Sequence, residues 1–370
     1  MKNFEGREHL SVVNEERKSL PIGSGEKIVK VREKLTLPVE SVKNTVVWVN
    51  PAFPEAPLKL RLGRPTELGV FFTPTVQKDG KESKNLKISP EWSEGRSGLL
   101  GSVIFQDKNG KLYRDVDLKG VGFFRDVFGK YKVAELKKDK SNPLSAAGLM
   151  DYQLALRDQS YSEKLNKAGI RTHRVLAIVD LEEVVMGDGR KVSIEEIKHR
   201  GLISKKMRPV IEIRAFGTKD RIDFLNDRRL GESAIEDAKK IIAQEQGKDV
   251  KKISDEGYLR WFAKKLGEQI AKLRNLGLSH NYLQVHNITL DCRIVDLDSV
   301  DSAKVRAGEE KRPEKDVFDE DFFAARESLE FLANKVLSTK NIEHSHMYTI
   351  IDFLLKIYEA YYKKELQSKK

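Results

Sequence analysis

The spacing of hydrophobic and polar positions predicts a strand-rich first half of the chain. Short apolar runs at residues 46–49 and 68–72 are separated by prolines and turn residues, a pattern typical of strands. Further strands are predicted at residues 102–106, 113–119, 174–179 and 210–214. Turns are expected at residues 109–110 and 187–189, where glycine and polar residues interrupt the apolar pattern.

One long helix interrupts these strands. It is expected to begin near Ser141 or Asn142, with Pro143 in its first turn, and to end at Gly169. Two apolar arcs run along it, and acidic residues lie beside them. Asp158 borders one arc and Glu163 lies near the other.

After residue 231 the pattern becomes helical. Helices are predicted at residues 232–246 and 255–276, and the second has Ser254 as its N-cap and Gly277 at its end. Its apolar positions 259, 262, 266, 270 and 273 form one stripe, which indicates a helix facing the core. A charged loop at residues 308–315 is then expected, followed by two amphipathic helices.

A predicted hairpin between these helical segments carries candidate metal chemistry. Residues 288–290 and 293–295 are apolar runs, and a two-residue connection between them would place Asn287 opposite Asp296. Residues opposite one another in an antiparallel pair have Cβ atoms about 5 Å apart. An amide oxygen and a carboxylate at that spacing suit Mg²⁺. The alternative is a surface hairpin whose polar ends are solvated.

The order of elements predicts an α+β chain, with a bilobal protein-kinase-like fold that has a strand-rich N-lobe and a helical C-lobe. The domains expected are a strand-rich N-terminal extension at residues 1–92, a kinase-like N-lobe at 93–215, and a helical C-lobe with the metal-binding hairpin at 216–370. The same order is common among α+β proteins. The individual residues must therefore carry the functional argument.

Kinase-like chemistry needs a glycine-rich cover for the phosphates, a strand lysine and a helix carboxylate that orients the lysine. Gly98 and Gly101, with Gly95, precede the strand expected at 102–106. Lys119 ends its predicted strand beside glycines. We expect it to pair with Asp158, with Glu163 as the competing acid, because a carboxylate beside an apolar stripe is costly unless it is paired.

Two arginines and two histidines complete the candidate set. Arg214 and Arg221 flank a turn at Gly217 and could clamp phosphate oxygens. His280 and His286 fit no standard zinc spacing.

Composition narrows the possible partners. The 370 residues carry a net charge of +11, but the basic residues are mixed with acids and no RNA-binding aromatic motif is visible, which argues against nucleic acid as the partner. There is no apolar run long enough to cross a membrane, and the charged N-terminus does not look like a secretory signal. The single cysteine, Cys292, excludes an internal disulfide and suits a cytoplasmic environment.

Three blocks of residues, in order and at matching spacing, resemble the selenoprotein O family of kinase-like protein adenylyltransferases. They are residues 118–122, residues 156–174, and residues 277–287 continuing to 296. The resemblance implies that Lys119 pairs with Asp158, where the family usually has Glu. It also implies that Asn287 and Asp296 bind metal and that Arg214 contacts nucleotide phosphate. In that family ATP is inverted, so AMP passes to Ser, Thr or Tyr hydroxyls.

The chain departs from the family at the residue before the metal-binding Asn. There the family has Asp as the expected base, and this chain has His286. The C-terminal cysteine or selenocysteine of some members is missing, and residues before about 90 show little match.

The function expected is transfer of AMP from ATP, with Mg²⁺ or Mn²⁺, to hydroxyls of a protein substrate, with His286 as the candidate catalytic base. The alternatives are a catalytically impaired nucleotide-binding pseudokinase, a protein-kinase-type phosphotransferase, and a basic nucleic-acid-binding module. The sequence names neither the protein substrate nor the oligomeric state.

Overall fold

The computed structural model describes residues 37–54, 56–73, 87–90, 94–127, 130–133, 148–226, 228–340 and 342–368. The chain divides into two compact units. Unit 1 comprises Met1–Gln159 and Arg174–Phe216, and unit 2 comprises Ser160–His173 and Gly217–Lys370. The division after Phe216 falls next to the boundary expected after residue 215.

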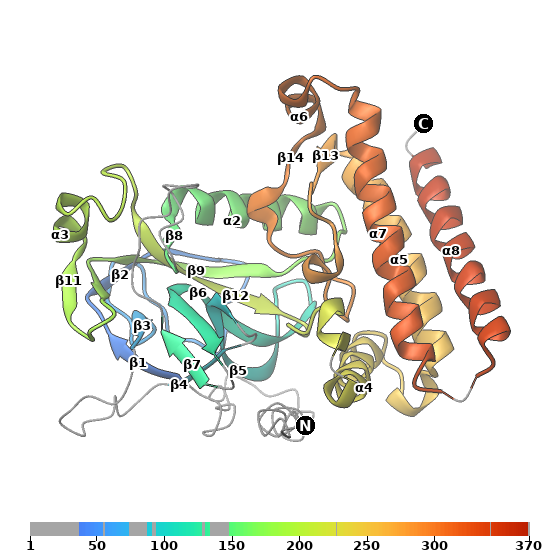
Figure 1. The fold of residues 1–370 in the computed structure, drawn as a ribbon, viewed down its shortest axis with the longest axis horizontal. Helices are drawn as coiled ribbons and strands as arrows, with labels where there is room; N and C mark the ends of the chain where they lie inside the picture. The colour runs from blue at the N-terminus through green and yellow to red at the C-terminus, as the bar shows by residue number, and fades with distance from the viewer. Residues whose placement is uncertain are drawn as a thin grey trace. The chain divides into compact units, whose positions relative to one another are not determined.

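Unit 1 is built on one antiparallel sheet, to which ten strands belong among the described residues (Figure 1). The order along the sheet is β2-β9-β12-β6-β5-β4-β1-β3, with β7 paired to β6 and β8 paired to β12. The strands are β1 (Leu37–Ser41), β2 (Asn44–Val49), β3 (Val70–Phe72), β4 (Lys87–Pro90), β5 (Glu94–Gln106), β6 (Leu112–Val127), β7 (Lys130–Val133), β8 (Met150–Asp151), β9 (Arg174–Leu181) and β12 (Pro209–Phe216). A separate hairpin, β10 (Glu183–Val185) and β11 (Lys191–Ser193), leads into the short helix α3 (Ile194–His199).

The strands before residue 92 belong to this sheet, although the sequence places them in a separate extension. β2 pairs with β9, and β4 pairs with β5. Val46 and Phe72 are fully buried in the same core as Leu118 and Ile211. A shared core explains the arrangement, because these short strands could not bury their apolar side chains alone.

Two expectations about the central strands are wrong. Gly98 and Gly101 do not lie in a loop before a strand; they lie inside β5, opposite Leu118 and Val116 of β6. Lys119 does not end its strand, because β6 continues to Val127. Bulges in the β5–β6 pairing accommodate this long ladder.

Helix α2 (Tyr152–Lys167) spans the division between the units. The start expected near residue 141 lies outside the described residues, and the chain is still extended at β8. Asp151 pairs with β12, and its Oδ1 accepts a hydrogen bond from Gln153 N (2.8 Å), so the helix begins only at Tyr152. The expected end is confirmed: Gly169 adopts φ +76°, a conformation that glycine tolerates best.

Unit 2 is mainly helical. Its helices are α4 (Arg228–Glu245), α5 (Asp255–Asn275), α6 (Ala303–Glu310), α7 (Glu314–Leu337) and α8 (His344–Gln367). Short pieces connect them: the 3₁₀ turns η3 (Ile222–Asn226), η4 (Val250–Lys252), η5 (Val285–Asn287) and η6 (Leu297–Ser299), and the paired strands β13 (Leu278–Ser279) and β14 (Asp301–Ser302). None of the described helices has the length and apolarity that a bilayer crossing needs.

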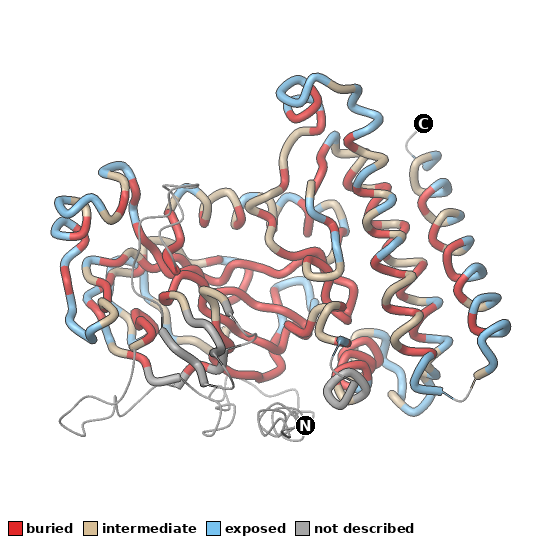
Figure 2. Tube along the Cα trace, in the orientation of Figure 1, coloured by how far each residue is buried: buried red, intermediate tan, exposed pale blue. Residues whose placement is uncertain are grey.

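Helix α5 is the centre of unit 2 and packs against α7 and α8. Ser254 caps it by accepting a hydrogen bond from Gly257 N (3.1 Å), as expected. The five residues of the expected stripe are all buried, and buried positions recur along α5, α7 and α8 (Figure 2). The expected loop at 308–315 is largely helical instead, because α6 extends to Glu310 and α7 starts at Glu314.

The fold class is as expected. The chain is α+β, with a sheet-rich first unit and a helical second unit.

Candidate functional site

In unit 1 the expected ion pair between Lys119 and Asp158 is present. Lys119 Nζ lies 3.9 Å from Asp158 Oδ2, and the two side chains are 5% and 0% exposed. Lys119 comes from β6 and Asp158 from α2, so the pair joins the sheet to the helix that packs on it. Glu163, the competing acid, is only half-buried. A buried ammonium and a buried carboxylate each need such compensation.

Arg214, expected to hold phosphate, is engaged by another residue of the sheet. Its Nε and Nη2 donate to the two carboxylate oxygens of Asp117, at 2.9 and 2.6 Å. The side chains are 1% and 0% exposed, and the guanidinium also lies 5.3 Å from the ring centroid of Phe216. This two-pronged geometry is the strongest form of an arginine–carboxylate pair.

These ion pairs belong to a row of charged residues on one face of the sheet. Asp115, Asp117 and Lys119 occupy alternate positions along β6. On the neighbouring strand β12, Arg214 lies opposite Asp117, and Glu212 lies opposite Lys119. All five are at least 96% buried. The alternation of charges at 115, 117 and 119 is visible in the sequence, but its partners on β12 are about 95 residues away, so the sequence alone does not identify a buried charged face.

In unit 2, the side-chain amide of Asn287 is held in one orientation. Its Nδ2 donates to Tyr282 O (2.7 Å), which fixes the orientation of the amide. Its Oδ1 is buried and has no hydrogen-bond partner among the described residues, and the residue is 4% exposed. A buried carbonyl oxygen left in this state costs about 1–3 kcal/mol. An unmet acceptor of this kind points to a ligand.

Asp296 lies beside Asn287, because Val295 N donates to Asn287 O (3.0 Å). Asp296 adopts φ +57°, in the left-handed region that few non-glycine residues occupy. Arg221 Nη1 lies 3.1 Å from Asp296 Oδ2 and also donates to His286 O (2.5 Å). Arg221 therefore joins the two segments that carry the expected metal ligands.

The register of the hairpin differs from the expected one by one residue. Ile288 is bridged to Ile294, not to Val295, and Thr289 N donates to Arg293 O (3.0 Å). The connection contains three residues, and the third, Cys292, has φ +59°. Loops of this length combine a turn with one left-handed residue. Asn287 therefore lies across from Val295, with Asp296 one residue further on.

A buried polar network holds the tip of this hairpin. Asp291 accepts hydrogen bonds from Arg293 Nε (2.7 Å) and Thr289 Oγ1 (2.6 Å), and Arg171 Nη2 lies 3.4 Å from it. Glu245 forms ion pairs with Arg171 at 2.7 Å and with Arg293 at 3.1 Å. Burial raises the pKa of Asp291, but Arg293 and Arg171 outweigh burial and hold that pKa below its ordinary value. No local sequence pattern indicates this network, because its residues are far apart in the chain.

The loop before Asn287 is fixed by His280 and by α7. Asp321, on α7, accepts hydrogen bonds from the backbone N–H groups of His280 (2.7 Å) and Asn281 (3.1 Å). The His280 ring is fully buried, and its Nε2 donates to Val295 O (2.8 Å). His280 therefore supports the backbone between the two candidate metal ligands.

A further motif becomes evident in this loop. His280, Leu283 and Asn287 match the spacing H-x-x-L-x-x-x-N of the kinase catalytic loop, whose third residue is the catalytic Asp. Tyr282 occupies that third position here and is 56% exposed. This spacing is readable from the sequence alone.

His286, the other candidate base, is half-buried. Burial, with a smaller contribution from Arg221, lowers the pKa of its imidazole below the ordinary value. The ring is therefore neutral at neutral pH, and it can accept a proton only weakly.

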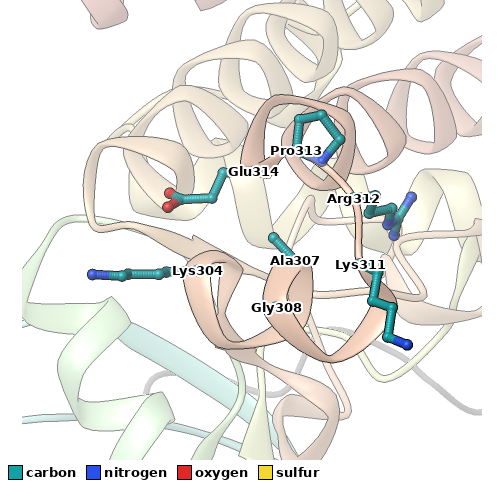
Figure 3. Close-up of a pocket in the computed structure, with 7 residues that line it drawn as sticks. All are labelled: Lys304, Ala307, Gly308, Lys311, Arg312, Pro313 and Glu314. Carbon is teal, nitrogen blue, oxygen red and sulfur yellow. The ribbon is translucent and has the colours of Figure 1, made fainter.

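Other parts of unit 2 offer less. Among the described residues, no cluster of three or more His, Cys, Asp or Glu side chains is arranged to hold a metal ion, so a metal site depends on Asn287 together with Asp296. An open hollow lies between the end of α6 and the start of α7 (Figure 3). Lys304 and Lys311 extend from it in different directions, so they do not converge on one anion.

No protein-family model matches the chain, and no curated protein matches it. Among solved structures, the chain is similar to a Toxoplasma gondii specific rhoptry antigen kinase domain. The sequence identity is 10% and the TM-score is 0.33, over 98% of this chain and 97% of that one. The resemblance to the selenoprotein O family therefore rests on the sequence blocks alone.

Proposed function

We propose that the chain binds ATP with Mg²⁺ or Mn²⁺ and transfers AMP to Ser, Thr or Tyr hydroxyls of a protein substrate. The observation that carries the proposal is the buried Oδ1 of Asn287, which has no hydrogen-bond partner among the described residues and lies beside Asp296. The choice of AMP over phosphate rests on the resemblance to the selenoprotein O family.

The residues fit a hard divalent cation. Mg²⁺ prefers oxygen ligands, and in kinase-like proteins an Asn and an Asp hold the ions on the nucleotide phosphates. Asn287 offers an amide oxygen whose direction is fixed by the bond from its Nδ2 to Tyr282 O. Asp296 offers a carboxylate that is 29% exposed and therefore accessible from solvent. When bound, the cation would neutralise charge that develops on the phosphates.

Lys119 and Asp158 support the same function from unit 1. A lysine held by a helix carboxylate is the part of kinase-like proteins that contacts nucleotide phosphates. The buried pair at 3.9 Å matches that arrangement. Gly98, Gly101 and Arg214 remain weaker parts of the proposal, because the glycines lie within β5 and Asp117 engages Arg214.

In this reaction the substrate hydroxyl oxygen would form a bond to the α-phosphorus, and the bond to pyrophosphate would break. The hydroxyl proton would pass to the His286 imidazole, which is neutral before the step. Because its pKa is lowered, His286 is a weaker base than an imidazole in water.

A second candidate is a nucleotide-binding pseudokinase, and a specific observation favours it. The two positions at which a catalytic carboxylate is expected hold Tyr282 and His286. Neither side chain supplies a carboxylate, so binding without transfer is consistent with the same geometry.

ATP labelled at the α- or the γ-phosphate distinguishes these functions. Protein that retains only the α label supports AMP transfer, and retention of the γ label shows phosphotransfer instead. ATP-dependent thermal stabilisation with neither label retained shows a pseudokinase. In that case His286→Asp should restore labelling, whereas His344→Asp, at an exposed histidine of α8, should not.

A further inference from the structure

Arg221 is held firmly beside the candidate metal site. Its backbone forms an antiparallel bridge with Thr289, and the next residue, Ile222, donates from its N–H to Ile288 O (2.9 Å). Its side chain is 13% exposed and contacts His286 O and Asp296 Oδ2 through the same atom, Nη1. The guanidinium is thus fixed at the one carboxylate of the proposed metal clamp, Asn287 with Asp296.

This position conflicts with a bound divalent cation. A guanidinium N–H and a metal ion both need the lone pairs of Asp296, and the two positive charges repel one another. The backbone contact to His286 O does not depend on Asp296. Because Nη1 makes both contacts, Arg221 keeps His286 O while it loses Asp296 if the carboxylate of Asp296, which is 29% exposed, turns away from it.

A neighbouring carboxylate makes that change less costly. Asp223 is two residues away; burial raises the pKa of its carboxyl, and the positive charge of Arg221 lowers that pKa in part. Asp223 Oδ1 is itself buried without a hydrogen-bond partner among the described residues. The positive charge of Arg221 thus keeps some compensation after Asp296 is released.

We propose that Arg221 occupies the metal clamp in the free protein and exchanges partners when metal and nucleotide bind. The divalent cation takes Asp296, and Arg221, still bonded to His286 O, turns to a phosphate oxygen of the nucleotide. This inference rests on the proposed function, because it requires the clamp to bind metal. The exchange makes Arg221 oppose binding of metal alone and favour binding of metal together with nucleotide, so the two ligands are coupled.

Titration of Mn²⁺ followed by electron paramagnetic resonance tests the exchange. A charge within about 4–6 Å changes the ionisation of a carboxylate by tenfold or more, so Arg221→Gln should tighten binding of Mn²⁺ alone by on the order of tenfold. Arg221→Lys keeps the charge and should stay within about threefold of the wild type. ATP should tighten Mn²⁺ binding to the wild type, and this gain should be much smaller in Arg221→Gln.

The matched control is Arg260→Gln on α5, where an exposed arginine pairs with Glu256. It should leave Mn²⁺ binding unchanged, and circular dichroism should show each variant folded. If Arg221→Gln binds Mn²⁺ alone no more tightly than the wild type does, the exchange is refuted while the clamp stands. If no variant binds Mn²⁺, with or without ATP, the proposed function fails and the exchange fails with it.

Discussion

The loop that carries Asn287 depends on one buried carboxylate, that of Asp321. Replacing Asp321 with Ala removes the acceptor for the N–H groups of His280 and Asn281, at 2.7 and 3.1 Å. Hydrogen bonds to a charged group contribute about 1.5–3 kcal/mol each. The variant also relieves the cost of burying a carboxylate that is 4% exposed. We therefore expect a net loss of about 2–4 kcal/mol in the local free energy of opening.

Hydrogen exchange read by mass spectrometry on residues 278–287 measures this loss, because it reports the opening of that segment rather than of the whole chain. The control is Asp319→Ala on the same helix. Its carboxylate is 34% exposed and lies 3.4 Å from Arg274, so the change should stay within about 0.5 kcal/mol. Protection of residues 278–287 that falls equally in both variants, or by less than about 1 kcal/mol in Asp321→Ala, would refute the reasoning.

Two further predictions concern buried carboxylates. Asp158→Asn removes the charge that pairs with the buried Lys119 and should lower the unfolding free energy by about 2–4 kcal/mol. Glu163→Gln, the control on the same helix, should lower it by less than about 0.5 kcal/mol. Equal shifts in melting temperature for the two variants would contradict the buried pair. Burial raises the pKa of Asp223 from 3.8 to about 6, so this one group should contribute a loss of stability as pH rises from about 4 to about 6 and its carboxyl ionises. Asp223→Asn should abolish this loss. Its unfolding free energy, relative to that of the wild type, should therefore be about 2 kcal/mol higher at pH 7.5 than at pH 4. Urea unfolding at the two pH values that shows the same difference between variant and wild type at both would refute the prediction.

Local patterns were readable where one element determines its own structure. The apolar stripe on α5 follows from helical periodicity. The cap follows from Ser254, whose side chain accepts a hydrogen bond from the backbone N–H three residues later. The pairing of Lys119 with Asp158 was also predictable, because a carboxylate beside an apolar arc needs a partner.

Features that depend on distant residues or on unusual backbone were not readable. Asp117 pairs with Arg214, which lies 97 residues later in the chain on another strand, and no local sequence pattern predicts that pairing. The hairpin register depends on a left-handed Cys292, a residue type with no special preference for that conformation. Helix α2 begins at Tyr152 because Asp151 is held in the sheet by β12, a tertiary contact that the local sequence does not reveal.

The most direct test of the account is calorimetric titration of ATP with and without Mg²⁺, for the wild type and for Asn287→Ala. The wild type should bind ATP only when the cation is present, and Asn287→Ala should weaken that binding by about tenfold or more, as expected for loss of a metal ligand. The control is Asn334→Ala on α7, whose amide also donates to a backbone carbonyl (3.0 Å), and it should bind as the wild type does. ATP binding that is absent, or that is unaffected by Mg²⁺ and by loss of Asn287, would contradict the metal clamp.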